Sequence, residues 1–128
     1  MSYYFSKTLP VGFDEAVRRA TEALKQGGFG IITETDVKRT FKEKLGVDFR
    51  NYRILGACNP TLAYEALQLE DKVGTMLPCN VVVQEIGQDR TEIAAIDPVA
   101  SMQAIENPRL KSSAEHVQAL LRNVIDGL

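Results

Sequence analysis

The two cysteines, Cys58 and Cys79, are the residues of this sequence best suited to chemistry. A thiolate is a nucleophile and a ligand for soft metals, and two neighbouring thiols can form a reversible disulfide. Cys58 comes just before a predicted helix start at Asn59 and Pro60, where a helix dipole can lower a thiol pKa. If the strands that carry the cysteines are antiparallel neighbours, the two thiols come close. One hypothesis is therefore a thiol-dependent redox or soft-metal-binding protein.

The competing interpretation of the cysteines is structural. Free cysteine is among the most buried residue types and packs like a small apolar side chain. A zinc site usually needs four ligands, and the cysteines could add only His116, the single histidine. The sequence lacks Cys-x-x-Cys, Gly-x-Ser-x-Gly and phosphate-loop motifs. It therefore predicts no cofactor and no assembled catalytic residues, and binding is favoured over turnover.

A ligand site near the cysteines defines the remaining candidate residues. Glu34 and Asp36 bracket the end of a predicted strand. Asp36 has a structural role as the N-cap of the next helix, whereas none is evident for Glu34, which is kept as a candidate. The predicted ligand-binding residues are Cys58, Asn59, Cys79, Glu34 and Tyr52.

A basic segment covers residues 38–53, with six basic and two acidic side chains and hence a local charge of +4. Such a segment is commonly a solvated helix face that serves solubility. The alternative is a docking surface for an anionic ligand or an acidic partner. The sequence leaves both open.

Patterns of apolar and β-branched residues predict five strands, over 3–9, 29–35, 52–58, 80–86 and 90–96. The last two strands flank a tight turn and must pair as an antiparallel hairpin. Helices are predicted between 13 and 27 and between 36 and 46, each ended by glycine.

Three later helices share one start signal, an asparagine or aspartate followed by proline. Asn59 and Pro60 open a helix that runs to about Leu69, and 71–77 links it to the next strand. The pair at 97–98 predicts one or two turns. The pair at 107–108 leads towards the last helix, which a capping box at 112–115 is expected to begin.

These elements predict one domain over 1–128, with an α+β fold: an antiparallel or mixed sheet with helices packed on one face. The uncovered face must then be polar, hold a ligand or meet another subunit. Fifteen basic and seventeen acidic residues give a net charge of −2, which argues against nucleic-acid binding. No apolar run is long enough to span a membrane and no secretory signal is recognisable, so we expect a cytoplasmic protein.

Several motifs in the correct order resemble the domain of unknown function 302 family along essentially the whole chain. They lie at 28–37 (GFGIITETDV), 52–60 (YRILGACNP) and 77–83 (LPCNVVV), with Asp97-Pro98 and Met102 following. The resemblance implies a TATA-binding-protein-like fold, β-α-β4-α in outline with extra short helices, and a homodimer. It implies no activity.

The leading interpretation is a small homodimeric binding protein for a small ligand or a protein partner. Its candidate ligands are a small molecule or an anion, and neither nucleic acid nor a membrane is expected as a partner. The thiol-dependent protein using Cys58 and Cys79 is the alternative, and a purely structural interaction module is a third reading.

Overall fold

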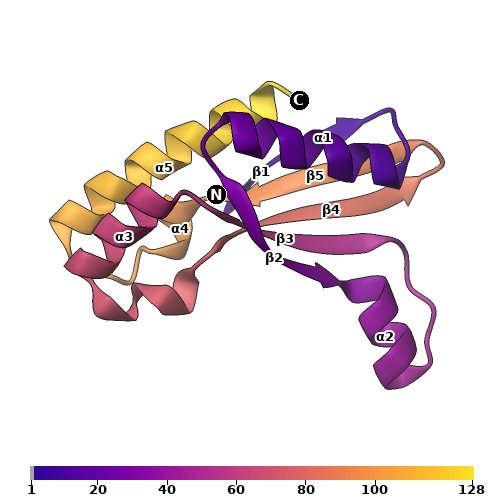
Figure 1. Cartoon of the computed structure of the whole chain (residues 1–128), viewed down its shortest axis with the longest axis horizontal. Helices are drawn as coiled ribbons and strands as arrows, with labels where there is room; N and C mark the ends of the chain where they lie inside the picture. Colours follow the sequence, from indigo (N-terminus) through magenta and orange to yellow (C-terminus); the bar gives the residue numbers. More distant parts are fainter. Residues whose placement is uncertain (1) are drawn as a thin grey trace.

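The computed structural model describes residues 2–128 and contains a single five-stranded antiparallel sheet with strand order β1-β5-β4-β3-β2 (Figure 1). The strands lie within a residue or two of the segments expected from the sequence. They are β1 Tyr4–Leu9, β2 Gly30–Asp36, β3 Tyr52–Cys58, β4 Cys79–Gly87 and β5 Arg90–Ile96.

Two long helices, α1 (Phe13–Gln26) and α5 (Pro108–Asp126), lie on one face of the sheet (Figure 1). Side chains alternate along each strand, so every second residue of β4 and β5 faces these helices. The buried positions Val81, Val83 and Ile93 pack with the apolar stripes of both helices in the main core. The predicted α+β fold with helices on one face is therefore confirmed.

A second, smaller hydrophobic cluster lies beyond the end of the sheet. It is built by α3 (Pro60–Leu69), the 3-10 helix η1 (Asp71–Met76), the residues that follow α4 (Pro98–Ser101) and the first turn of α5. Its buried members are Ala66, Val73 and Leu110, with Leu77, Met102 and Ile105 packed against them. The segment 71–77, expected to be a plain linker, is thus largely helical.

The asparagine or aspartate before each proline caps its helix as predicted. Asn59 accepts a hydrogen bond from the Leu62 N–H at 3.1 Å, and Asp97 accepts one from the Val99 N–H at 3.0 Å. The expected capping box at 112–115 is wrong, because Asn107 already caps α5 and residues 112–115 lie inside the helix. A side-chain acceptor followed by proline was a sufficient start signal.

The short helix α2 (Val37–Leu45) and the loop after it project away from the sheet as an arm (Figure 1). No residue of α2 is buried. The arm is held by aromatic contacts, with the Phe41 and Phe49 rings 5.2 Å apart and Phe49 next to Tyr52 at 6.1 Å. Within the described residues, no helix is long and apolar enough to cross a membrane.

Gly56 lies at a close approach between three strands. A Cβ atom there would stand 1.9 Å from Thr33 Oγ1 and 2.7 Å from Pro78 Cγ, both inside van der Waals contact. The irregularity in β2 between Ile31 and Thr33 brings Thr33 opposite Gly56. Only a hydrogen fits at this point, so glycine lets β2, β3 and the start of β4 pack together.

We predict that Gly56→Ala lowers the free energy of unfolding by about 1–3 kcal/mol, the usual cost of overpacking. Gly30→Ala is the matched control, since a Cβ at Gly30 meets nothing within 4 Å. It should change stability by less than about 0.5 kcal/mol. Urea denaturation of both variants measures the difference, and equal effects would contradict the close-packing account.

Candidate functional site

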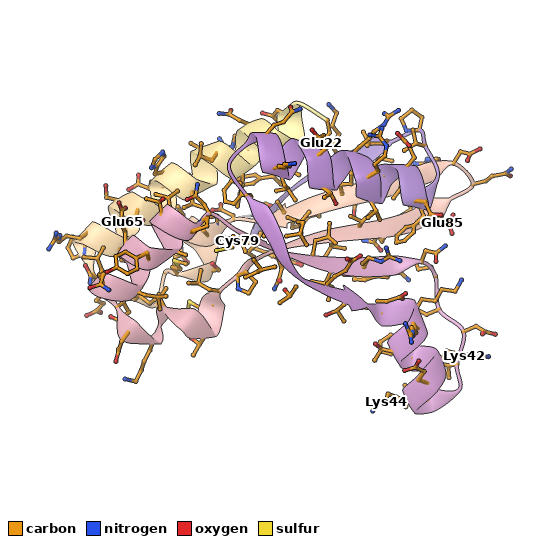
Figure 2. All side chains as sticks on the ribbon, in the orientation of Figure 1. Glu22, Lys42, Lys44, Glu65, Cys79 and Glu85 are labelled. Atoms are coloured by element: carbon orange, nitrogen blue, oxygen red, sulfur yellow. The ribbon has the colours of Figure 1, made fainter. Side chains whose placement is uncertain are left out.

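A cavity of about 290 Å³ lies where the sheet ends against α3, α4 and α5. Its walls come from both hydrophobic clusters, so we call it the seam cavity. Phe29, Ala57, Cys79 and Val117 belong to the main core, and Ala66, Leu77, Met102 and Leu110 to the smaller one. Figure 2 shows Cys79 at this junction, with Glu65 further out on α3.

The course of the backbone explains why the cavity forms here. Ala57 of β3 pairs with Cys79 of β4 as the last partners of that ladder. Beyond this pair the chain leaves the sheet into α3 and returns through η1. The excursion builds the second cluster beside the first, and the two clusters meet without filling the space between them.

The walls of the seam cavity are almost entirely apolar. None of the lining residues carries a charge, and the polar ones are the two cysteines, Asn59 and Ser113. Asn59 uses its side-chain oxygen to cap α3. Within residues 2–128 its amide nitrogen has no hydrogen-bond acceptor, and no fully buried side-chain nitrogen or oxygen lacks a partner. The Asn59 amide nitrogen is therefore still accessible.

Burial, with a smaller contribution from the neighbouring Cys58, raises the pKa of the Cys79 thiol to about 11. Cys79 is only 8% exposed. At neutral pH its thiol is protonated and therefore a poor nucleophile and metal ligand. Both cysteines are free, and Cys58 is half-buried.

The structure brings together three of the five predicted ligand-binding residues. Cys58, Asn59 and Cys79 all line the seam cavity. Tyr52 lies instead in a shallow depression on the opposite, uncovered face of the sheet. Glu34 is exposed on β2, and its carboxylate lies 3.1 Å from the Arg53 guanidinium, a structural role that the sequence did not reveal.

Most of the cavity wall was not anticipated from the sequence. Ala63, Met102, Ser113 and Val117 come from three helices that are separated along the chain. The one local signal is the number of alanines on α3, where Ala63 and Ala66 leave room that larger apolar side chains would fill. That signal identifies a small-residue helix face but not the cavity in front of it.

The remaining candidates lie apart from the cavity. His116 is exposed in a shallow depression with Glu65 and Arg109. Among residues 2–128, no group of three or more His, Cys, Asp or Glu side chains is placed to hold a metal ion.

Half of the six basic side chains at 38–53 already have an acidic partner. Arg39 lies 3.0 Å from Glu43, and Lys42 lies 3.1 Å from Asp48. The third is Arg53, which pairs with Glu34. Lys42 and Lys44 stand on the projecting arm, far from Cys79 (Figure 2). Because the local charge of +4 already counts Glu43 and Asp48, their two ion pairs leave the net charge of this segment unchanged.

The raised pKa of Cys79 predicts a loss of stability in alkali. Below pH 9.0, the value for an unperturbed thiol, folded and unfolded states both keep the proton. Between pH 9.0 and about 11 the unfolded state loses it while the folded state retains it, so the free energy of unfolding falls as pH rises. Two pKa units correspond to about 3 kcal/mol.

The measurement is denaturant unfolding of wild type and Cys79→Ala from pH 8 to pH 11. Other groups titrate in both proteins, so the difference between the two stability curves isolates Cys79. We expect wild type to lose about 2–3 kcal/mol relative to the variant over this range. Parallel curves would show that Cys79 is not desolvated.

The sequence profile of the family described as "Domain of unknown function DUF302" matches residues 5–128. A solved structure is also similar, that of the uncharacterized conserved protein DUF302 from Bacillus stearothermophilus. The two chains share 31% sequence identity with a TM-score of 0.89, and the match covers 98% of each. No functionally curated protein matches the sequence. The chain therefore belongs to the DUF302 family, to which no function is assigned.

Proposed function

We propose that this protein is a binding protein that takes a small, predominantly apolar ligand into the seam cavity. The observation that carries the proposal is the almost wholly apolar lining of this cavity. Its volume of about 290 Å³ is comparable with the smaller ligand pockets of proteins, at roughly 300 Å³.

The small size of several wall residues keeps the cavity open. Ala57, Ala63, Ala66 and Ala114 all face it. Larger apolar residues at these positions would fill the space and add buried area. Small residues at four positions from three elements instead leave a continuous apolar space.

The rim of the cavity offers a path for an apolar ligand. Ile32 is 61% exposed and Leu67 is 42% exposed, and both are also part of the wall. Single exposed apolar residues are ordinary on protein surfaces, but these two are continuous with an apolar cavity. Together they form an apolar entrance to the cavity, with Ile32 contributed by β2 and Leu67 by α3.

The residues that line the seam cavity favour ligand binding over catalysis or thiol chemistry. The lining contains no carboxylate, histidine or lysine that could act as an acid or base. A redox or soft-metal role would need a thiolate at Cys79, and burial keeps that thiol protonated at neutral pH. An anionic ligand would find no cation in the cavity.

Benzene is a suitable probe because apolar cavities of about 150 Å³ already bind it. We expect benzene to shift backbone amide NMR resonances around Ala63, Ala66 and Val117 in a saturable way. Ala63→Leu should weaken or abolish this binding, and by filling the cavity it should raise stability by roughly 0.5–2 kcal/mol.

Ala119→Leu is the matched control, since Ala119 is exposed on α5 and does not line the cavity. It should leave the benzene-induced shifts unchanged. If wild type shows no saturable shift near the cavity, or if Ala63→Leu binds benzene as well as wild type does, the binding proposal fails.

We further propose that the protein is a homodimer that uses the uncovered face of the sheet, with a TATA-binding-protein-like arrangement of helices behind that face. The main helices α1 and α5 lie on the other side (Figure 1). The uncovered face carries a mixed surface that a second copy would bury: apolar and aromatic residues beside polar ones, namely Tyr4, Tyr52, Val82, Ala94 and Ile96 with Asn80, Gln84 and Glu92. The two free cysteines fit a reducing compartment, which supports a cytoplasmic location.

Sedimentation equilibrium at micromolar concentration tests the dimer, which should show twice the 14.2 kDa mass of the chain. Val82→Lys places a charge at the centre of the proposed interface and should yield a monomer. Ala119→Lys adds the same charge on α5, away from that face, and should stay dimeric. A 14.2 kDa wild-type species would contradict the proposal.

A further inference from the structure

We infer that the ligand of the seam cavity is an uncharged aliphatic molecule of about ten non-hydrogen atoms, with one hydrogen-bond-accepting oxygen held by the Asn59 amide. This inference rests on the proposed binding function and deepens it. Its three parts are the size, the absence of charge and the position of the acceptor. Each follows from a different observation.

The size follows from the volume. A water molecule occupies about 30 Å³ of liquid, and a methylene group is of similar bulk. A cavity of about 290 Å³ therefore accepts about ten such groups. The alkyl part would contact the leucines, alanines and methionine of the walls.

The absence of charge follows from the lining. No Asp, Glu, Lys, Arg or His side chain faces the cavity. A charged group taken from water into such a space is stabilised only if it finds a counter-charge or several hydrogen bonds. The lining offers no counter-charge, and its polar groups are only the Asn59 amide, the Ser113 hydroxyl and the two thiols, so a carboxylate or ammonium group is disfavoured there.

The N-terminus of α3 does not offer a site for an anion either. Pro60 has no N–H group. The Leu62 N–H donates to the Asn59 side chain, and the Ala63 N–H donates to the Asn59 carbonyl at 2.9 Å. Most of the backbone N–H groups that could bind an anion at the start of α3 are thus absent or already hydrogen-bonded.

The acceptor position follows from Asn59. Asn59 lines the cavity and commits its side-chain oxygen to the cap, which leaves its amide nitrogen, beside Gly28, as a hydrogen-bond donor with no acceptor among residues 2–128. An N–H donor selects an oxygen acceptor, such as a ketone, ester, ether or hydroxyl oxygen. The cap thus holds the amide in place for recognition.

Isothermal titration calorimetry at pH 7 with three probes of equal chain length tests the inference: 2-nonanone, nonanoate and nonylammonium. We expect 2-nonanone to bind one molecule per chain, and the two ions to bind at least tenfold more weakly. From 2-hexanone to 2-nonanone the affinity should rise about fourfold per methylene. It should stop rising at 2-dodecanone, when the cavity is full.

Asn59→Asp tests the amide directly, because aspartate caps a helix as well as asparagine does but has no N–H donor. This variant should bind 2-nonanone about tenfold more weakly and nonylammonium more tightly than wild type. Thr61→Asp adds the same charge on α3 outside the cavity wall and should change 2-nonanone affinity less than twofold. Thermal melts by circular dichroism confirm that both variants fold.

The outcomes separate this inference from the proposed function. If nonanoate or nonylammonium binds wild type as tightly as 2-nonanone, the uncharged-ligand inference is overturned while the binding function stands. Unchanged 2-nonanone affinity in Asn59→Asp overturns the role of the amide. If none of the three probes binds and benzene does not bind either, the proposed function itself is overturned.

Discussion

The pairing of β3 with β4 is the constraint on which the rest of the structure depends. This ladder ends at Ala57 and Cys79, and the chain between them must make its excursion outside the sheet. Gly56 allows the pairing to continue to this point because only a hydrogen fits between Thr33 and Pro78. A second hydrophobic cluster then forms beside the main core. The seam cavity exists because two cores meet there, each packed mainly against its own elements.

The helices around the cavity are held from outside by polar interactions. α3, α4 and α5 all begin with an asparagine or aspartate cap followed by proline. Asn107 also donates a hydrogen bond to the Leu69 carbonyl at 3.0 Å, which ties the start of α5 to the end of α3. Gln118 donates to the Asp97 carboxylate at 3.0 Å, which ties α5 to the cap of α4. These bonds fix the helix positions without placing side chains in the space between them.

Much of the fold could be predicted from the sequence, because its signals are local. Alternation identified the strands, and the caps at Asn59 and Asp97 identified helix starts. The start of α5 was misplaced because a second start signal, at 112–115, lies inside the helix, whereas the asparagine and proline at 107–108 mark its actual start. Three of the five predicted ligand-binding residues reached the cavity since Cys58, Asn59 and Cys79 lie where the ladder ends.

The cavity itself could not be predicted, because it depends on how far apart the apolar faces of several segments lie. No single segment of the sequence encodes that distance. Periodicity shows that α3 and α5 have apolar faces, but not how far apart those faces lie. Tyr52 and Cys58 lie an even number of positions apart on β3, so the sequence places both side chains on the same face of the strand. Only Cys58 lines the cavity, because the chain turns into α3 at that residue. Glu34 was kept as a site candidate because its partner Arg53 is a neighbour only across the sheet.

The most direct test of this account is a crystal structure of the protein under xenon pressure. Xenon enters apolar cavities without needing a polar partner. The account predicts a xenon peak between Ala57, Ala66 and Val117, with surrounding side chains unmoved. A collapsed seam in which Ile32, Leu67 or Met102 fills the space, with no xenon bound, would contradict it.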